Sequence, residues 1–180
     1  MSPASPKPLK SLTSPTINWT KHYVRQEDGW CGPAVIKMAL SAVGIDKTQA
    51  EIVADTNISW WGVDTSIMIA YLSRFFSELG FLTGAAIEDI EKHLNKGHFV
   101  IVDWWDDLDD DPADPPDGHY SIIAGVNREQ GTIKLIDPSH RGIWDMKLSD
   151  FAARWYDYLD VNQKIRQSGW LLWLAPASKK

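Results

Sequence analysis

Residues 26–44 read QEDGWCGPAVIKMALSAVG, a polar loop followed at once by a mostly apolar run. The run from Cys31 to Val43 has a proline near its first helical position, where the fixed φ of proline suits a helix start. It ends at Gly44, and glycine tolerates the left-handed conformation that closes many helices. The stretch therefore predicts a buried helix that begins at the only cysteine of the chain.

Farther along the chain, the spacing of apolar residues predicts helices first and strands afterwards. The expected helices cover residues 47–55, 64–79 (capped by Asp64 or Thr65 and ended by Gly80), 87–95 (closed by Gly97) and 149–156 (capped by Ser149). The expected strands are FVIVDWW (99–105), HYSIIAGV (119–126), TIKLID (132–137) and WLLWLA (170–175). This order predicts an α+β domain in which N-terminal helices, one of them buried, pack on an antiparallel sheet.

Composition limits the possible classes of protein. A chain of 180 residues, 44% of them hydrophobic, is sufficient for one domain, which we expect at residues 17–176 after a proline-rich, disordered arm at residues 1–16. The net charge of −6 argues against a nucleic-acid partner. No signal peptide or membrane segment is evident, so we expect a cytoplasmic protein. One cysteine excludes an internal disulfide and any zinc site with two thiolates, and we expect neither metal nor cofactor.

Cys31 is the first candidate for chemistry. At the start of a helix, unpaired backbone N–H groups and the helix dipole favour an anion such as a thiolate. The alternative is that Cys31 is a small core residue, although its place between Trp30 and Gly32 at the helix start argues against this. Gln26, five residues upstream, could donate its side-chain amide to an oxyanion together with the Cys31 N–H; otherwise it is a solvated loop residue.

A thiolate nucleophile needs a base, and His119 is the best placed of five histidines. It opens one expected strand, and the turn NREQG returns the chain to Asp137 near the open end of the hairpin. The two residues are within a few positions of being opposite, and one bulge could remove that offset. The alternatives are a strand-end histidine and a turn aspartate before Pro138, with His140 as a weaker candidate base.

The segments QEDGWCGPA, GHYSIIAGV and IDPS, followed by LSDFAARWY, resemble the bacteriocin-processing double-glycine peptidases and their stand-alone relatives in the papain-like clan. The resemblance covers most of the chain and implies a papain-like cysteine peptidase fold. It also implies Cys31 as nucleophile, His119 as base, Asp137 as the residue that orients the histidine, and Gln26 in the oxyanion hole. Papain has one more residue between its equivalent glutamine and cysteine. If the likeness extends to specificity, a peptide or protein substrate is cut after small residues such as Gly-Gly.

These residues predict a cysteine peptidase that forms a thioester on Cys31 and hydrolyses it. The same residues also fit a transamidase or transpeptidase, or a peptide-binding module of the same fold without activity. The oligomeric state is left open. Tryptophans expected to narrow the cleft and contact substrate are Trp30, Trp60, Trp61, Trp104 and Trp105. The segment from Asp103 to Asp117 holds eight aspartates; we expect a solvated loop, or alternatively one that favours basic substrates or binds calcium.

Overall fold

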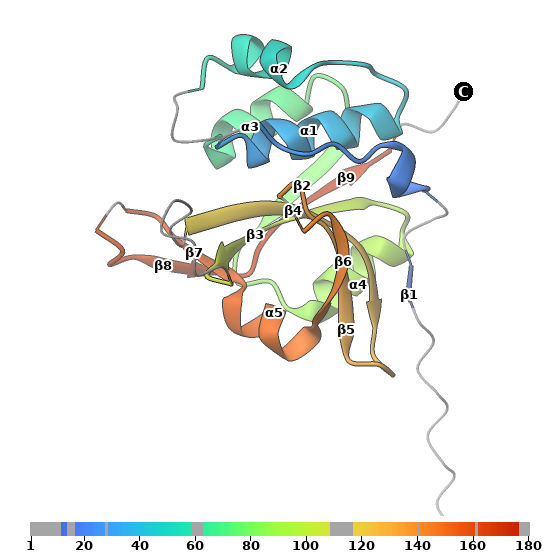
Figure 1. Ribbon diagram of the computed structural model, residues 1–180, viewed down its shortest axis with the longest axis vertical. Coiled ribbons are helices and arrows are strands. Elements are labelled where there is room, and N and C mark those ends of the chain that lie inside the picture. The colour runs from blue at the N-terminus through green and yellow to red at the C-terminus, as the bar shows by residue number, and fades with distance from the viewer. Residues whose placement is uncertain are drawn as a thin grey trace, which may run out of the picture.

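A central antiparallel sheet with helices on both faces forms the domain in a computed structural model of the chain (Figure 1). The structure describes residues 17–27, 29–58, 63–108, 117–139, 141–160 and 162–176, together with the backbone of residues 12–13. The expected α+β fold is confirmed. No helix within these residues is long and apolar enough to cross a membrane.

The helices lie in two groups, as Figure 1 shows. One group covers one face of the sheet, and it comprises α1 (Cys31–Ala42), α2 (Gln49–Thr56) and α3 (Thr65–Leu72). The other lies against the opposite face, and it comprises α4 (Ile87–Asn95) and α5 (Leu148–Arg154). A short 3-10 turn, η1 (Trp19–Lys21), precedes α1.

The main sheet has the strand order β2-β9-β3-β4-β5-β6, with β1 paired to β4, and β7 and β8 form a separate hairpin. The strands are β1 (Leu12–Thr13), β2 (Glu78–Leu82), β3 (Phe99–Asp106), β4 (Asp117–Asn127), β5 (Thr132–Ile136), β6 (Ile143–Lys147), β7 (Tyr156–Tyr158), β8 (Arg166–Ser168) and β9 (Trp170–Ala175). All pairings are antiparallel.

Two apolar cores hold the layers together, one on each face of the sheet. Alternate residues of β3 supply them: Ile101 enters the core under α1 to α3, whereas Val102 enters the core that contains Phe151 of α5. Helix α1 is buried along nearly its whole length and ends, as expected, before Gly44, whose φ is +82°. A long buried helix thus packs against β4 in the interior of the sheet.

Several predicted boundaries are wrong. The helix expected at residues 64–79 ends at Leu72, and residues 78–82 form β2 instead. Gly80 is therefore a strand residue rather than a helix terminator. It allows close packing, because a β-carbon there would lie 2.6 Å from the indole of Trp173. Lys147, not Ser149, is the cap residue of α5, whereas Asp64 caps α3 as predicted.

The ends of the chain also differ from the expectation. Leu12 and Thr13 pair with Val126 and Gly125, so part of the N-terminal arm adds a strand to the sheet. The other residues of that arm lie outside the described residues. Strand β6 and the β7–β8 hairpin, which projects from the body of the domain in Figure 1, were not among the expected elements.

Candidate active site

Cys31 and His119 meet where the start of α1 lies against β4. Cys31 is the first residue of α1, is partly exposed, and its side chain forms a hydrogen bond with the imidazole of His119. The start of α1 also packs closely on Val63, just before α3, and this packing requires glycine at position 32, since a β-carbon there would lie 2.7 Å from a γ-carbon of Val63. A larger residue after the cysteine would displace Val63 or the start of α1.

Asp137 is the second partner of His119. The imidazole Nε2 lies 2.7 Å from the Asp137 Oδ1, and both side chains are almost fully buried. Because Nε2 bonds the carboxylate, Nδ1 is the ring atom left to face the sulfur of Cys31. The three side chains thus form a connected chain from thiol to imidazole to carboxylate.

A bulge in β4 brings His119 and Asp137 to the same face of the sheet. Val126 pairs with Ile133, but beyond the shift between Ile123 and Gly125 the pairing becomes Ile123 with Leu135. Continued along β4, this register leaves His119 two positions from the residue opposite Asp137. An offset of two keeps both side chains on one face, whereas without the bulge the offset would be three and would place them on opposite faces. A bulge is therefore present, as the sequence allowed, but it reduces the offset to two positions and does not remove it.

Further donors keep Asp137 ionised. Its Oδ1 also accepts the Ser139 N–H at 2.9 Å, and its Oδ2 accepts the Trp144 Nε1–H at 3.2 Å. The guanidinium of Arg141 lies 3.7 Å from Oδ2. Burial opposes ionisation, but the hydrogen bonds and the charge of His119 prevail and lower the pKa of Asp137 to about 2.

His119 is correspondingly held in its protonated form. Burial disfavours the imidazolium, but the hydrogen bonds to Asp137 and Cys31 and their negative charges raise the pKa of His119 well above its ordinary value. The indole of Trp104 stands perpendicular to the imidazole, with ring centres 5.6 Å apart. Its own Nε1–H donates to the Ser121 hydroxyl at 3.0 Å, which fixes the indole. The ring of His119 is therefore confined by a hydrogen bond on each side and an aromatic edge.

The loop that carries Gln26 is anchored at several points. The Gln26 N–H donates to the Pro138 carbonyl at 2.8 Å, which ties this loop to the segment that follows Asp137. Gln49 bonds the loop on both sides of Gln26, through the Arg25 carbonyl at 2.9 Å and the Glu27 N–H at 3.2 Å. The sequence analysis missed this role of Gln49, because a polar residue in the first turn of a surface helix gives no sign of its distant partners.

The profile of the Peptidase_C39 like family matches residues 12–162. The chain belongs to this family. The comparison with curated proteins gives no significant match.

Solved structures share the fold of this C39-like domain. The chain is similar to the peptidase domain of Streptococcus ComA, a bi-functional ABC transporter involved in a quorum sensing pathway (TM-score 0.61, 15% identity, covering 86% of this chain and 96% of that one). It is similar to a Bacillus anthracis protein described as a C39-like peptidase (TM-score 0.67, 14% identity, 94% and 100%). A double glycine motif protease from the AMS/PCAT transporter, solved with the leader peptide, matches with TM-score 0.54 and 14% identity (85% and 91%). At these identities the likeness establishes the fold alone, and it confirms the predicted fold.

The tryptophans expected to line the cleft of the C39-like domain are not equivalent. Trp30 and Trp105 are partly exposed, and Trp105 stacks on Tyr156 with ring centres 6.0 Å apart. Trp104 is fully buried, so the expectation that it contacts substrate is wrong, and it supports His119 instead. Trp60 and Trp61 lie outside the described residues.

A pair of carboxyl groups beside Cys31 was not expected. Asp103 is 6% exposed and lies beside the side chain of Asp157, which comes from β7. Burial, followed by the negative charges of Asp157 and Cys31, raises the pKa of Asp103 well above its ordinary value. Burial also raises the pKa of Asp157. Both shifts favour one proton on the pair over two negative charges.

In the rest of the aspartate-rich segment, two aspartates form ion pairs and the others lie at the start of β4 or outside the described residues. Asp106 pairs with Arg141, and Asp107 pairs with Arg154, so these two aspartates are neutralised locally. Residues 109–116 lie outside the described residues, and the expected solvated loop or calcium site there stays a prediction.

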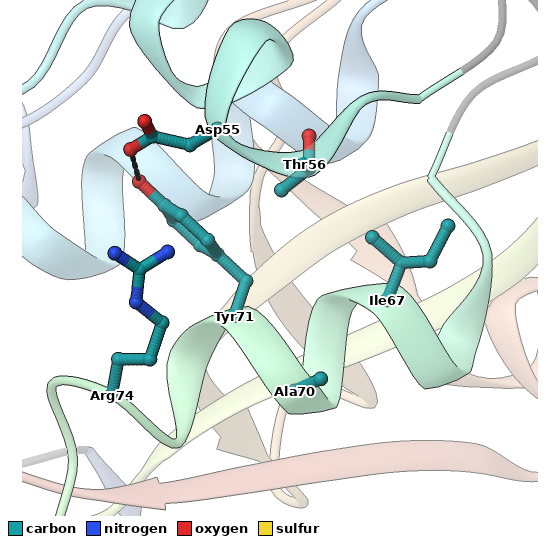
Figure 2. A pocket seen from close by; sticks show the side chains of 6 residues that line it. All are labelled: Asp55, Thr56, Ile67, Ala70, Tyr71 and Arg74. Carbon is teal, nitrogen blue, oxygen red and sulfur yellow. Dashed lines mark hydrogen bonds between the residues drawn. The ribbon is translucent and has the colours of Figure 1, made fainter.

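A separate shallow pocket of about 270 Å³ lies between α2 and α3, away from Cys31. Figure 2 shows Tyr71 bonded to Asp55 across it, with the guanidinium of Arg74 beside the tyrosine ring. Asp55 already pairs with Lys47, and Arg74 lies over the rings of Tyr71 and Phe75. We assign it no role in the chemistry.

Proposed function

We propose that this C39-like domain is a cysteine peptidase that hydrolyses peptide bonds through a thioester on Cys31. The observation that carries the proposal is the continuous connection from Cys31 through His119 to Asp137. A partly exposed thiol at a helix start, a buried imidazole and an ionised carboxylate together supply a nucleophile, a proton carrier and an orienting group.

In the proposed reaction, the Cys31 thiolate attacks the carbonyl carbon of the scissile amide. The imidazolium of His119 then gives its Nδ1 proton to the amide nitrogen, which leaves as an amine when the C–N bond breaks. In the second half, neutral His119 takes a proton from water, whose oxygen displaces the sulfur and releases the carboxylic acid. Asp137 keeps the proton on Nε2, so the ring presents Nδ1 in both halves.

The negative oxygen of each tetrahedral intermediate needs donors. We assign this role to the Cys31 N–H and the Gln26 side-chain amide, because Gln26 lies in a loop anchored to Pro138 and clamped by Gln49. A loop held at three points places an amide with little loss of entropy when the charge develops. A Gln26→Ala substitution should lower kcat by about 100-fold or more with a small change in KM.

By similarity to a structural neighbour that is a double glycine motif protease, we propose that the substrate is a peptide cut after small residues such as Gly-Gly. The same thioester could pass to an amine instead of water, which would make the protein a transamidase. Mass spectrometry of the products, with and without added glycine amide, separates the two: an amide adduct in place of the free acid identifies the transamidase.

The deciding experiment is alkylation by iodoacetamide across pH, because it requires no substrate. The proposed thiolate–imidazolium pair predicts rapid alkylation of Cys31 well below pH ~8.5, which is the ordinary pKa of a free thiol. His119→Ala should return the reaction to that ordinary range, whereas His22→Ala, which removes a hydrogen bond to Ser41 instead, should not. If Cys31 reacts as an ordinary thiol in the wild-type protein, the peptidase proposal fails and a peptide-binding module becomes the better account.

A further inference from the structure

Asp103 and Asp157 are brought together by segments distant in the sequence. Asp103 lies on β3, opposite Tyr120 of β4, and Asp157 comes from the β7–β8 hairpin. The carboxylate of Asp157 packs so closely on Gly118 that any β-carbon at that position would collide with it. The acid pair therefore lies over the residue that precedes His119, at the wall of the catalytic site.

One oxygen of this pair is an unused acceptor. The side chain of Asp103 is more than nine-tenths buried, and its Oδ1 has no hydrogen-bond partner among the described residues. A buried acceptor without a partner is unfavourable, so a donor that a ligand brings to this carboxyl group would be bound favourably.

No lysine or arginine in the described ranges pairs with either carboxyl group. Other aspartates in this half of the chain have such a partner: Asp106 with Arg141, Asp107 with Arg154, and Asp145 with Lys134. Asp157 accepts the Tyr158 N–H, and the titratable groups that act on Asp103 are Asp157, Cys31 and His119, with Tyr120 on the same wall. Within the part of the chain that the structure describes, the acid pair thus has no cation of its own, and the net charge of the protein is −6.

Aromatic side chains adjoin the acid pair. Trp105, two residues after Asp103 on β3, is partly exposed and contacts the rings of Tyr156 and Tyr158, which flank Asp157. Carboxylates beside aromatic faces suit a cation with an aliphatic stem, because the rings bind the stem and the carboxylates bind the charge.

We infer that Asp103 and Asp157 form a subsite beside Cys31 that binds a lysine or arginine side chain of the peptide substrate. This inference extends the proposed function, on which its place in catalysis rests. The arriving cation displaces the proton shared by the two carboxyl groups, gives the free Oδ1 a donor, and fixes the peptide relative to the nucleophile. A neutral side chain at the same position can do none of these.

Binding to a Cys31→Ser protein tests the subsite separately from catalysis. The probes are capped peptides built around Gly-Gly, in which one position at a time carries lysine or its uncharged analogue norleucine. At one position, the lysine peptide should bind at least about tenfold more tightly than the norleucine peptide. Binding of the lysine peptide should also release a proton, which calorimetry in buffers of different ionisation enthalpy measures. Asp103→Asn and Asp157→Asn should abolish both the preference and the proton release.

Asp145→Asn is the matched control, because it removes an exposed carboxylate on β6 that already pairs with Lys134, and it should leave the preference unchanged. Circular dichroism establishes that each variant is folded. Trp105→Ala is a second test of the subsite, and it should reduce the preference for lysine over norleucine. Equal affinity for lysine and norleucine peptides at every position, or no binding of lysine peptides at about 1 mM, overturns the inference. That result leaves the peptidase proposal intact if the wild-type protein still cleaves peptides.

Discussion

Replacing Asp137 by asparagine should destabilise the protein by about 2 kcal/mol at neutral pH. The difference between the pKa of about 2 in the folded protein and the ordinary value of 3.8 corresponds to that free energy of unfolding. Because the folded pKa is the lower one, the contribution is fully present above pH 3.8 and is lost as the pH falls toward 2. The asparagine of this variant can still accept from His119 and Ser139 at Oδ1, but its NH₂ group faces the donors of Trp144 and Arg141.

Urea unfolding followed by tryptophan fluorescence measures this loss at pH 7 and pH 3. The gap between wild type and Asp137→Asn should narrow by about 1 kcal/mol at pH 3, because the wild-type carboxyl group itself loses part of its advantage there. Asp145→Asn, at an exposed pair, should change stability by less than about 1 kcal/mol at either pH. An Asp137→Asn protein as stable as wild type at pH 7, or a gap that does not change with pH, would refute the electrostatic account of Asp137. In the same variant, the decrease of kcat/KM at alkaline pH should begin at a lower pH than in wild type, because His119 no longer has a carboxylate that raises its pKa.

Three further predictions concern residues around the site and the second core. Gly32→Ala should reduce alkylation and hydrolysis by more than about tenfold, since the added methyl would lie 2.7 Å from Val63 and displace the start of α1; wild-type rates in that variant would contradict the packing argument. Trp104→Phe should cost about 1–3 kcal/mol in urea unfolding, by leaving the buried Ser121 hydroxyl unpaired, and should lower kcat more than KM. Burial, then the neighbouring His98 and lysines, lowers the pKa of His93 from 6.5 to about 4. Between these two pH values the unfolded protein therefore binds a proton that the folded protein does not. As the pH falls from 6.5 to 4, the free energy of unfolding should decrease by about 2 kcal/mol, a value that allows for solvent screening. His93→Gln should remove this decrease.

Local sequence patterns correctly predicted those helices and strands whose ends and apolar faces are specified by their own residues. The start and end of α1 follow from Pro33 and Gly44, and the buried strand β3 follows from a continuous apolar run. The helix expected at residues 64–79 was too long, because the apolar residues of 75–79 fit helical spacing equally well. What makes residues 78–82 a strand is pairing with β9, some ninety residues later, and no local pattern contains that information.

The proximity of the proposed catalytic residues was predictable for a related reason, whereas that of the acid pair was not. Cys31 is recognisable by its place at a helix start, and His119 and Asp137 lie at two ends of one hairpin, so their proximity follows from short-range pairing. The contact between Asp103 and Asp157 depends on how the β7–β8 hairpin packs on Gly118. The three residues of β7 are too few to show a periodicity, and the packing of a hairpin on a sheet is decided by tertiary structure.

The site thus holds two kinds of carboxyl group next to one imidazole and one thiol. Asp137 is ionised because a ring N–H, a backbone N–H, an indole N–H and a guanidinium surround it. Asp103 is nearly as buried but has only another acid beside it, and burial and that charge raise its pKa and favour its protonated form. A permanent charge suits a group that, in the proposed reaction, restores the protonated form of His119 after each turnover, since its effect does not depend on what is bound. A retained proton suits a group that responds to a ligand, because a substrate cation can replace it and convert a neutral wall of the site into an ion pair.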